Sequence, residues 1–121
     1  MKIGNTKSAL WRRKGEDARY ERFAQLGYEA VDEDLADIRE PWYSDRTVME
    51  KECAARRSAA EKHGIEIWQV HGPWPTDDTS EEKREAVWDL MRRAIYGAYC
   101  LGSPNLVVHP QMPYGWDGPG A

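Results

Sequence analysis

Apolar residues recur along the chain with two different periods. Four short runs alternate or concentrate apolar residues, and the stretches between them place apolar residues every three or four positions. The first pattern predicts β-strands and the second predicts amphipathic helices. The predicted strands are "KIGN" (2–5), "EAVDED" (29–34), "IEIWQV" (65–70) and "NLVVH" (105–109). Their β-branched and aromatic residues are typical of strands buried in a parallel sheet.

The predicted helices end at regularly spaced glycines that are followed closely by a strand. Gly27, Gly64 and Gly102 are separated by 37 and 38 residues. A glycine just past a helix is expected because that position often takes a left-handed backbone conformation. A repeat of this length with one helix and one strand is a βα unit. The fold class is therefore α/β, with parallel βα repeats forming about four strands and three helices.

Two architectures fit these repeats, a flavodoxin-like open sheet and a partial (β/α)8 barrel. The segment after the first strand, "GNTKSALW", is neither a G-x-G-x-x-G turn nor a P-loop, which argues against nucleotide binding. Capping boxes are predicted from Thr47 to Glu50 and from Thr79 to Glu82. The third helix is expected to pack through one apolar stripe, formed by Val87, Leu90, Met91, Ala94, Ile95 and Ala98.

Two of the three histidines end matching strands, and each is followed at once by a turn. His71 precedes "GPWP", and His109 precedes "PQMP". Strict alternation predicts that Gln69 and His71 share one face of their strand. The same alternation predicts that Ile67 shares the face of His71, and that Val107 shares the face of His109. The residues expected to lie under the helices are Trp68, Val70, Leu106 and Val108. Both histidines are then expected at the carboxyl edge of the sheet, where parallel α/β folds build ligand sites.

Further polar and aromatic residues are predicted at the same edge. Asp32 and Asp34 have equal parity, opposite to Val31 and Leu35, and Trp74 follows His71 in a loop. A solvated strand end or a helix N-cap is the simpler explanation of such carboxylates. The residues expected to contact a substrate are Asp32, Gln69, His71, Trp74 and His109, and no catalytic residue is assigned.

Neutral histidines at such an edge have several possible roles. They can bind a divalent metal, act as acid or base near neutral pH, or hydrogen-bond a sugar hydroxyl. A catalytic metal site needs three protein ligands, so His71 and His109 would need a carboxylate or another donor beside them. Hydrogen-bonded pocket histidines without a catalytic role are the open alternative. His63, at a helix end, is assigned no function.

Composition narrows the class of protein. The chain has 121 residues, of which 40% are hydrophobic and 31% charged, and its net charge is −4. This balance predicts one globular domain over residues 1–121. No apolar window is long enough to cross a bilayer, and no secretory signal precedes the first strand, so we expect no membrane contact and a cytoplasmic location. Cys53 and Cys100 are expected to be buried thiols.

The residues resemble a known group of proteins. The segments "MKIGNT", "QVHGPWP", "TSEEKREAVWDLMRRAI" and "LGSPNLVVHPQMPYG" look like the first half of the xylose-isomerase-like TIM-barrel superfamily, and most of all like its sugar phosphate isomerases and epimerases. The resemblance implies a divalent metal, Mn, Zn or Mg, and a sugar or sugar phosphate substrate. It also implies that His71 and His109 line the sugar pocket, because the metal ligands of that branch come chiefly from later strands. In the related apurinic endonuclease branch, the matching histidines bind zinc.

A complete barrel takes about 250 residues, and the predicted strands end at the fourth. We therefore expect an N-terminal half barrel, either truncated or paired with a second copy through its exposed sheet edges. The leading functional expectation is part of a metal-dependent sugar phosphate isomerase or epimerase without activity of its own, since the later-strand carboxylates are lacking. A zinc-dependent endonuclease-like hydrolase is an alternative in which His71 and His109 bind the metal, although the acidic net charge argues against nucleic acid. A non-catalytic α/β binding domain is the third possibility.

Overall fold

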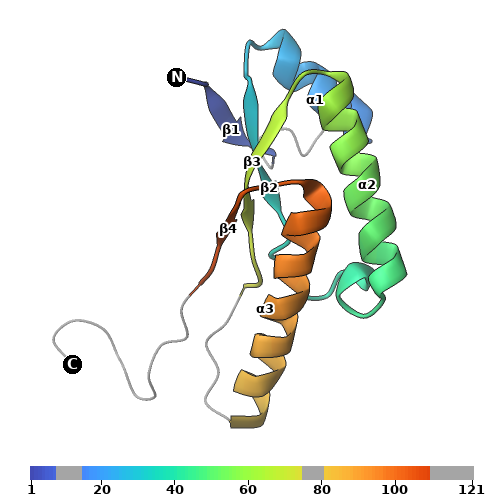
Figure 1. The fold of residues 1–121 in the computed structure, drawn as a ribbon, viewed down its shortest axis with the longest axis vertical. Helices are drawn as coiled ribbons and strands as arrows, with labels where there is room; N and C mark the ends of the chain where they lie inside the picture. The colour runs from blue at the N-terminus through green and yellow to red at the C-terminus, as the bar shows by residue number, and fades with distance from the viewer. Residues whose placement is uncertain (8–14, 75–80, 110–121) are drawn as a thin grey trace, which may run out of the picture.

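The computed structural model describes residues 1–7, 15–74 and 81–109. These residues form four strands, three α-helices and one 3-10 turn (Figure 1). The strands and helices alternate in the order β1 (Gly4–Thr6), α1 (Glu16–Gln25), β2 (Ala30–Asp34), η2 (Pro41–Tyr43), α2 (Arg46–Lys62), β3 (Glu66–His71), α3 (Glu81–Leu101) and β4 (Asn105–Val107). No helix in these ranges is long and apolar enough to span a membrane.

The four strands form one parallel sheet in which the spatial order β1-β2-β3-β4 is also the order along the chain. Figure 1 shows α1, α2 and α3 together on one side of the sheet, while the other side is not covered by a helix. A flavodoxin-like sheet has helices on both faces and a strand order that reverses at one point. Sequential order with one-sided helices is the arrangement of consecutive units of a (β/α) barrel.

The core lies between the sheet and the helices. It includes Val31 and Leu35 from β2, Val70 from β3, and Tyr20 and Phe23 from α1, all of which are almost fully buried. The other side chains of this cluster come from η2, α2, Ile65, Ile67 and α3. The helices are thus fixed to one face of the sheet by a continuous apolar layer, which positions the strand ends.

The three repeat glycines end their helices as predicted. Gly27, Gly64 and Gly102 have φ angles of 82°, 68° and 73°, in the left-handed region that glycine adopts without a steric penalty. The backbone N–H of Ile65 donates to Ala60 O at 2.9 Å, which closes the last turn of α2. The predicted βα repeat is therefore confirmed in its helix ends.

The predicted cap of α2 was wrong by two residues. The side chain of Asp45 accepts hydrogen bonds from the backbone N–H groups of Thr47, at 2.8 Å, and Val48, at 3.4 Å. Glu50 does not close a capping box, because its carboxylate accepts from Arg46 Nε at 2.9 Å and from the Tyr96 hydroxyl at 2.6 Å. The second predicted capping box begins at Thr79, which lies outside the described residues.

The apolar stripe of α3 was predicted correctly except at one position. Met91, Ala94 and Ala98 are buried, but Ile95 is 57% exposed. Gly97 takes the inward place instead, because α3 approaches so closely there that an added Cβ would lie 2.7 Å from Leu35 Cδ1.

A charged cluster is buried beneath the helices. Glu33 is completely buried and accepts hydrogen bonds from Lys7 Nζ at 2.9 Å, from Arg56 Nη1 at 3.2 Å and from the Tyr20 hydroxyl. Burial, followed by the charge of Glu33, raises the pKa of Tyr20 far above its usual range, so the phenol stays protonated and donates. The alternation along β2 directs Glu33 to the helices, and this cluster supplies the cations that make its burial possible.

Candidate functional site

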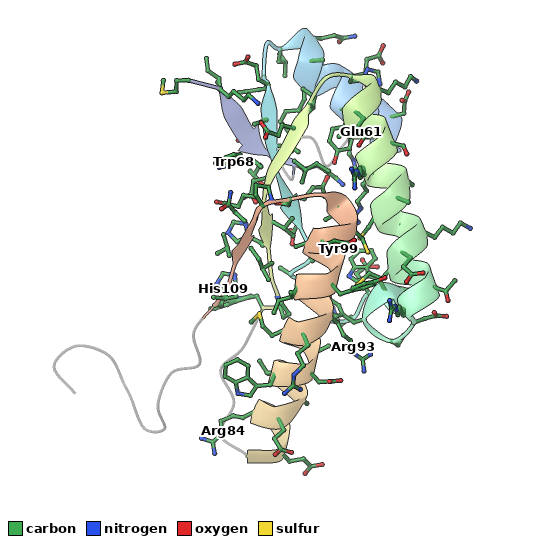
Figure 2. The ribbon with its side chains drawn as sticks, viewed as in Figure 1. Glu61, Trp68, Arg84, Arg93, Tyr99 and His109 are labelled. Atoms are coloured by element: carbon green, nitrogen blue, oxygen red, sulfur yellow. The ribbon has the colours of Figure 1, made fainter. Side chains whose placement is uncertain are left out.

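A bulge in β3 determines which side chains reach the uncovered face of the sheet. Val31 pairs with Ile67 and Asp32 pairs with Gln69, so Trp68 is the extra residue. As a result Ile67 and Val70 are both buried, whereas Trp68 is 53% exposed. Figure 2 shows Trp68 on the side of the sheet away from the helices. The prediction that Ile67 shares the face of His71 and that Trp68 lies under the helices was wrong, because strict alternation ignores the bulge.

Asp32 and His71 are joined on the uncovered face. The two carboxylate oxygens of Asp32 lie 2.9 and 3.1 Å from His71 Nδ1. A carboxylate can only accept, so Nδ1 bears the proton and donates it. The side chains of Asp32 and His71 are 20% and 36% exposed, respectively. In the neutral imidazole, Nε2 then has a free lone pair directed away from Asp32.

His109 lies beside this pair. Its ring is stacked on that of His71, with ring centroids 5.8 Å apart and planes 19° apart. The indole of Trp74 meets the ring of His109 edge-on at 4.9 Å. The sequence expectation that His71, His109 and Trp74 gather at one edge agrees with this arrangement, and Gln69 lies next to Asp32 in the strand pairing. We call Asp32, His71, Trp74 and His109 the rim site.

Backbone pairing beyond the strand ends holds the rim site in place. The Gly72 N–H donates to Val107 O at 2.9 Å, and the Trp74 N–H donates to Ala36 O at 3.0 Å. A Cβ on Gly72 would lie 3.0 Å from the same Val107 oxygen, so a side chain there would force the two strand ends apart. An isolated bridge also pairs Asp37 with Trp74. Residues 72–74 are therefore tied to the end of β4 and to the segment after β2.

Asp34 has a different role from Asp32 despite their equal parity. One Asp34 carboxylate oxygen accepts the backbone N–H of Ala36 at 2.7 Å. Such a bond closes a local turn in the way that aspartate often does at strand ends. Asp34 is exposed, and although it is the strand partner of His71, the imidazole bonds the carboxylate of Asp32 instead. The structure thus separates the two carboxylates that alternation alone could not distinguish.

The described residues do not form a metal site by themselves. Over residues 1–7, 15–74 and 81–109, no three histidine, cysteine or carboxylate side chains converge in a way that could hold an ion. Asp32 and His71 bond each other instead. What this geometry supports chemically is an oriented imidazole, whose Nε2 can accept a proton or a hydroxyl hydrogen bond while Asp32 stabilises the charged form.

One exposed residue of this face was missed by sequence reasoning. Trp68 is next to Gln69, the strand partner of Asp32, and borders a shallow cavity of about 220 Å³ whose lining also includes Asp32, Gln69 and Asn5. The only sequence signal was a large aromatic residue inside an otherwise aliphatic strand. That signal does not distinguish a covered position from an exposed one.

Comparisons with known proteins agree with this architecture. The chain is similar in structure to 3-keto-D-glucoside 4-epimerase from E. coli, with a TM-score of 0.66, 16% sequence identity, and coverage of 89% of this chain and 37% of that one. It is also similar to a D-tagatose 3-epimerase-like protein, with a TM-score of 0.65, 22% identity, and coverage of 97% and 41%. A xylose isomerase-like TIM barrel/4-hydroxyphenylpyruvate dioxygenase fusion protein matches with a TM-score of 0.60 and 18% identity, over 94% of this chain and 17% of that one. No curated protein sequence matches the chain.

The chain thus spans about two fifths of the length of the two epimerase-type structures. At these identities the likeness establishes the fold, a partial TIM barrel of four parallel strands and three helices. The family described as xylose isomerase-like TIM barrel matches residues 20–121 in sequence. On this match and on its strand order, the chain belongs to the xylose isomerase-like TIM barrel family.

Proposed function

We propose that residues 1–121 form the N-terminal half of a sugar isomerase or epimerase and supply one wall of its sugar pocket. The hydrogen bond between Asp32 and His71 is the observation on which this proposal depends. It leaves an oriented imidazole nitrogen on the uncovered face at the carboxyl edge, where barrels of this class bind ligands. The names of two structural neighbours, a 3-keto-D-glucoside 4-epimerase and a D-tagatose 3-epimerase-like protein, support a sugar as the ligand.

Each residue of the rim site has a role in this proposal. His71 Nε2 accepts a hydrogen bond from a sugar hydroxyl, and Asp32 holds the ring in the tautomer that makes this possible. Trp74 and His109 present aromatic surface to the apolar C–H face of a sugar ring. Gln69, paired with Asp32, offers an amide that can both donate and accept.

The divalent metal of the proposed enzyme would need ligands from outside the described residues, because no three donors converge within them. We therefore propose sugar binding without turnover for this chain alone. A zinc site of the endonuclease type remains a second candidate only because His71 and His109 stack on each other.

A titration followed by nuclear magnetic resonance tests the sugar proposal. D-fructose, D-tagatose and D-xylose, each with and without a phosphate group, are added to the full chain, and saturable shifts are expected at His71 and Trp74. His71→Asn removes one hydrogen bond and should weaken binding roughly 2- to 13-fold. His63→Asn is the matched control, because His63 lies far from the rim and contacts Asp17 at 3.0 Å. Equal effects of the two substitutions, or no saturable shift with any sugar, would contradict the proposal.

Metal analysis of the purified chain distinguishes the endonuclease-type zinc site from the sugar pocket. Stoichiometric zinc that is lost in both His71→Asn and His109→Asn would favour the endonuclease-like site. Sugar binding in metal-free protein would favour the sugar pocket.

A further inference from the structure

The uncovered face of the sheet has a hollow beside Trp68, near the amino ends of the strands. Its volume is about 320 Å³, and it is lined by Lys2, Gly4, Ala30, Glu66 and Trp68. We call these five residues the Trp68 hollow. Cavities of about 300 Å³ and more hold drug-sized ligands, so the hollow has room for one indole. The rim site lies at the opposite, carboxyl edge and shares no residue with the hollow.

The hollow forms because small residues lie beside a large one. Gly4, Ala30 and Glu66 pair side by side at the starts of β1, β2 and β3. A Cβ on Gly4 would lie only 3.0 Å from Ala30 O, so this close approach favours glycine. Trp68 is 53% exposed and lies on the side of the sheet away from the helices (Figure 2). The face thus combines an exposed indole with a depression next to it.

The hollow contains one cation and one anion. The ammonium group of Lys2 bonds the carboxylate of Glu66, and their side chains are 60% and 37% exposed. In a contact with two-fold symmetry the same surface patch lies on both partners. A patch with a single sign of charge would therefore repel its copy. A patch that contains both signs, as this one does, can meet a copy of itself with opposite charges facing each other.

A two-fold axis that runs parallel to the strands, above β2, suits both the shape and the charges. It places β1 of each copy opposite β3 of the other copy, because these two strands flank β2. Lys2 then faces Glu66 of the second copy, and Trp68 faces the part of the second copy's hollow where Gly4 has no side chain. All strands keep one direction in this arrangement, so the two rim sites lie at the same edge of the assembly.

We propose that the uncovered face docks a second copy of this chain in this arrangement, with each Trp68 inserted into the hollow of the other copy. A tryptophan that fills a pocket near the centre of a contact is the kind of residue that dominates the binding energy of an interface. A second copy supplies the indole, the depression and the two charges together. The inference goes beyond the sugar proposal, because it uses no residue of the rim site.

Charge reversal tests this contact. Sedimentation equilibrium of the full chain is compared with that of Lys2→Glu, of Glu66→Lys and of an equal mixture of the two variants. Each variant alone has two like charges in its hollow and should self-associate at least roughly tenfold more weakly, because like charges across an interface repel. In the mixture opposite charges meet, and association should return close to that of the unchanged chain. Both residues are exposed, so the reversals should not disturb the fold, which circular dichroism checks.

The matched control is the exposed pair of Arg57 and Glu61 on α2, joined at 2.8 Å. Reversing it, as Arg57→Glu or Glu61→Arg, should leave association unchanged, whereas Trp68→Ala should weaken association at least roughly tenfold. Equal association of all variants, or a mixture as weak as the single reversals, would overturn the inference. A chain that sediments as a monomer at every concentration would also overturn it, in favour of a partner of another sequence on this face.

Discussion

At the scale of single residues, the carboxylate of Glu33 is buried completely and joins several parts of the fold. Glu33 is 0% exposed and is bonded by Lys7, Tyr20 and Arg56. These partners come from the end of β1, from α1 and from α2, so the carboxylate ties three segments to β2. Removing one member of a buried ion cluster is costly, because the remaining charges lose their partner without regaining water.

Replacing Glu33 by glutamine should therefore destabilise the protein strongly. Glu33→Gln leaves Lys7 and Arg56 without one of their buried counter-charges, and we expect a loss of about 3–5 kcal/mol in the free energy of unfolding. Urea denaturation followed by circular dichroism measures this loss. The matched control is Glu61→Gln, which breaks the exposed 2.8 Å pair with Arg57 and should cost less than about 1 kcal/mol. A similar, small change in both variants would show that the buried cluster is not a source of stability.

The two cysteines differ in burial, and we expect them to differ in reactivity for that reason. Cys53 is 1% exposed, and burial raises the pKa of its thiol to about 11. The thiolate is the reactive form, and at pH 8 only about one Cys53 thiol in a thousand is ionised. Iodoacetamide should therefore alkylate the less buried Cys100 at least roughly tenfold faster, as measured by mass spectrometry of the digested protein.

In urea both thiols should react at similar rates, because unfolding removes the burial that protects Cys53. The variant Cys100→Ser should take up the label only slowly in the folded state. Fast alkylation of Cys53 in the folded variant would show that this part of α2 opens readily.

At the scale of elements, the start of α2 depends on one side chain. Asp45 accepts two backbone N–H groups of the first turn, at 2.8 and 3.4 Å. Asp45→Ala should lower the free energy of unfolding by about 1 kcal/mol, the usual cost of losing a helix cap. Thr47→Ala, at the position where a capping box is expected from the sequence, should change it by less than about 0.5 kcal/mol. A larger loss from Thr47→Ala than from Asp45→Ala, in thermal or urea unfolding, would contradict the cap seen in the structure.

Local patterns in the sequence predicted the helices and strands well. The features that they did not predict depend on pairing between strands that are far apart in the sequence. The strands around Val31, Val70 and Leu106 follow from apolar runs, and the helix ends follow from glycines with left-handed φ angles. The bulge at Trp68 could not be predicted, because it exists only in the register between β2 and β3. One extra residue there exchanges the faces of Trp68 and Ile67.

The rim site was likewise predictable from local rules only in part. The expectation that His71 and His109 meet at one edge followed from strand parity, which is a local rule, and from the general rule that parallel strands end at the same edge of a sheet. The bond from His71 to Asp32 depends on the relative register of β2 and β3, and the turn that occupies Asp34 depends on the backbone at Ala36. Likewise, parity directs Glu33 under the helices, but no local rule identifies Arg56, 23 residues away, as its partner.

At the scale of the whole molecule, the sheet is covered on one face only. All-parallel sheets in proteins almost always have both faces covered. Here the uncovered face displays Trp68, which is 53% exposed, and Trp74, which is 56% exposed. The described residues leave β1 and β4 as the two edges of the sheet. Exposed sheet edges and exposed indoles both favour association. Pairing of two copies across the uncovered face would bury the two indoles.

We therefore predict that the chain associates with itself in solution. Light scattering after size-exclusion chromatography should give a mass that rises with concentration from 13.9 kDa toward twice that value. Trp68→Lys puts a charge on the uncovered face and should shift the protein to the monomer at every concentration tested. Trp88→Lys is the matched control, because Trp88 is similarly exposed, at 58%, but lies on α3 in the helix layer. If Trp88→Lys breaks the assembly and Trp68→Lys does not, the contact is made by the helices rather than the sheet. A mass that stays at 13.9 kDa at every concentration would contradict self-association altogether.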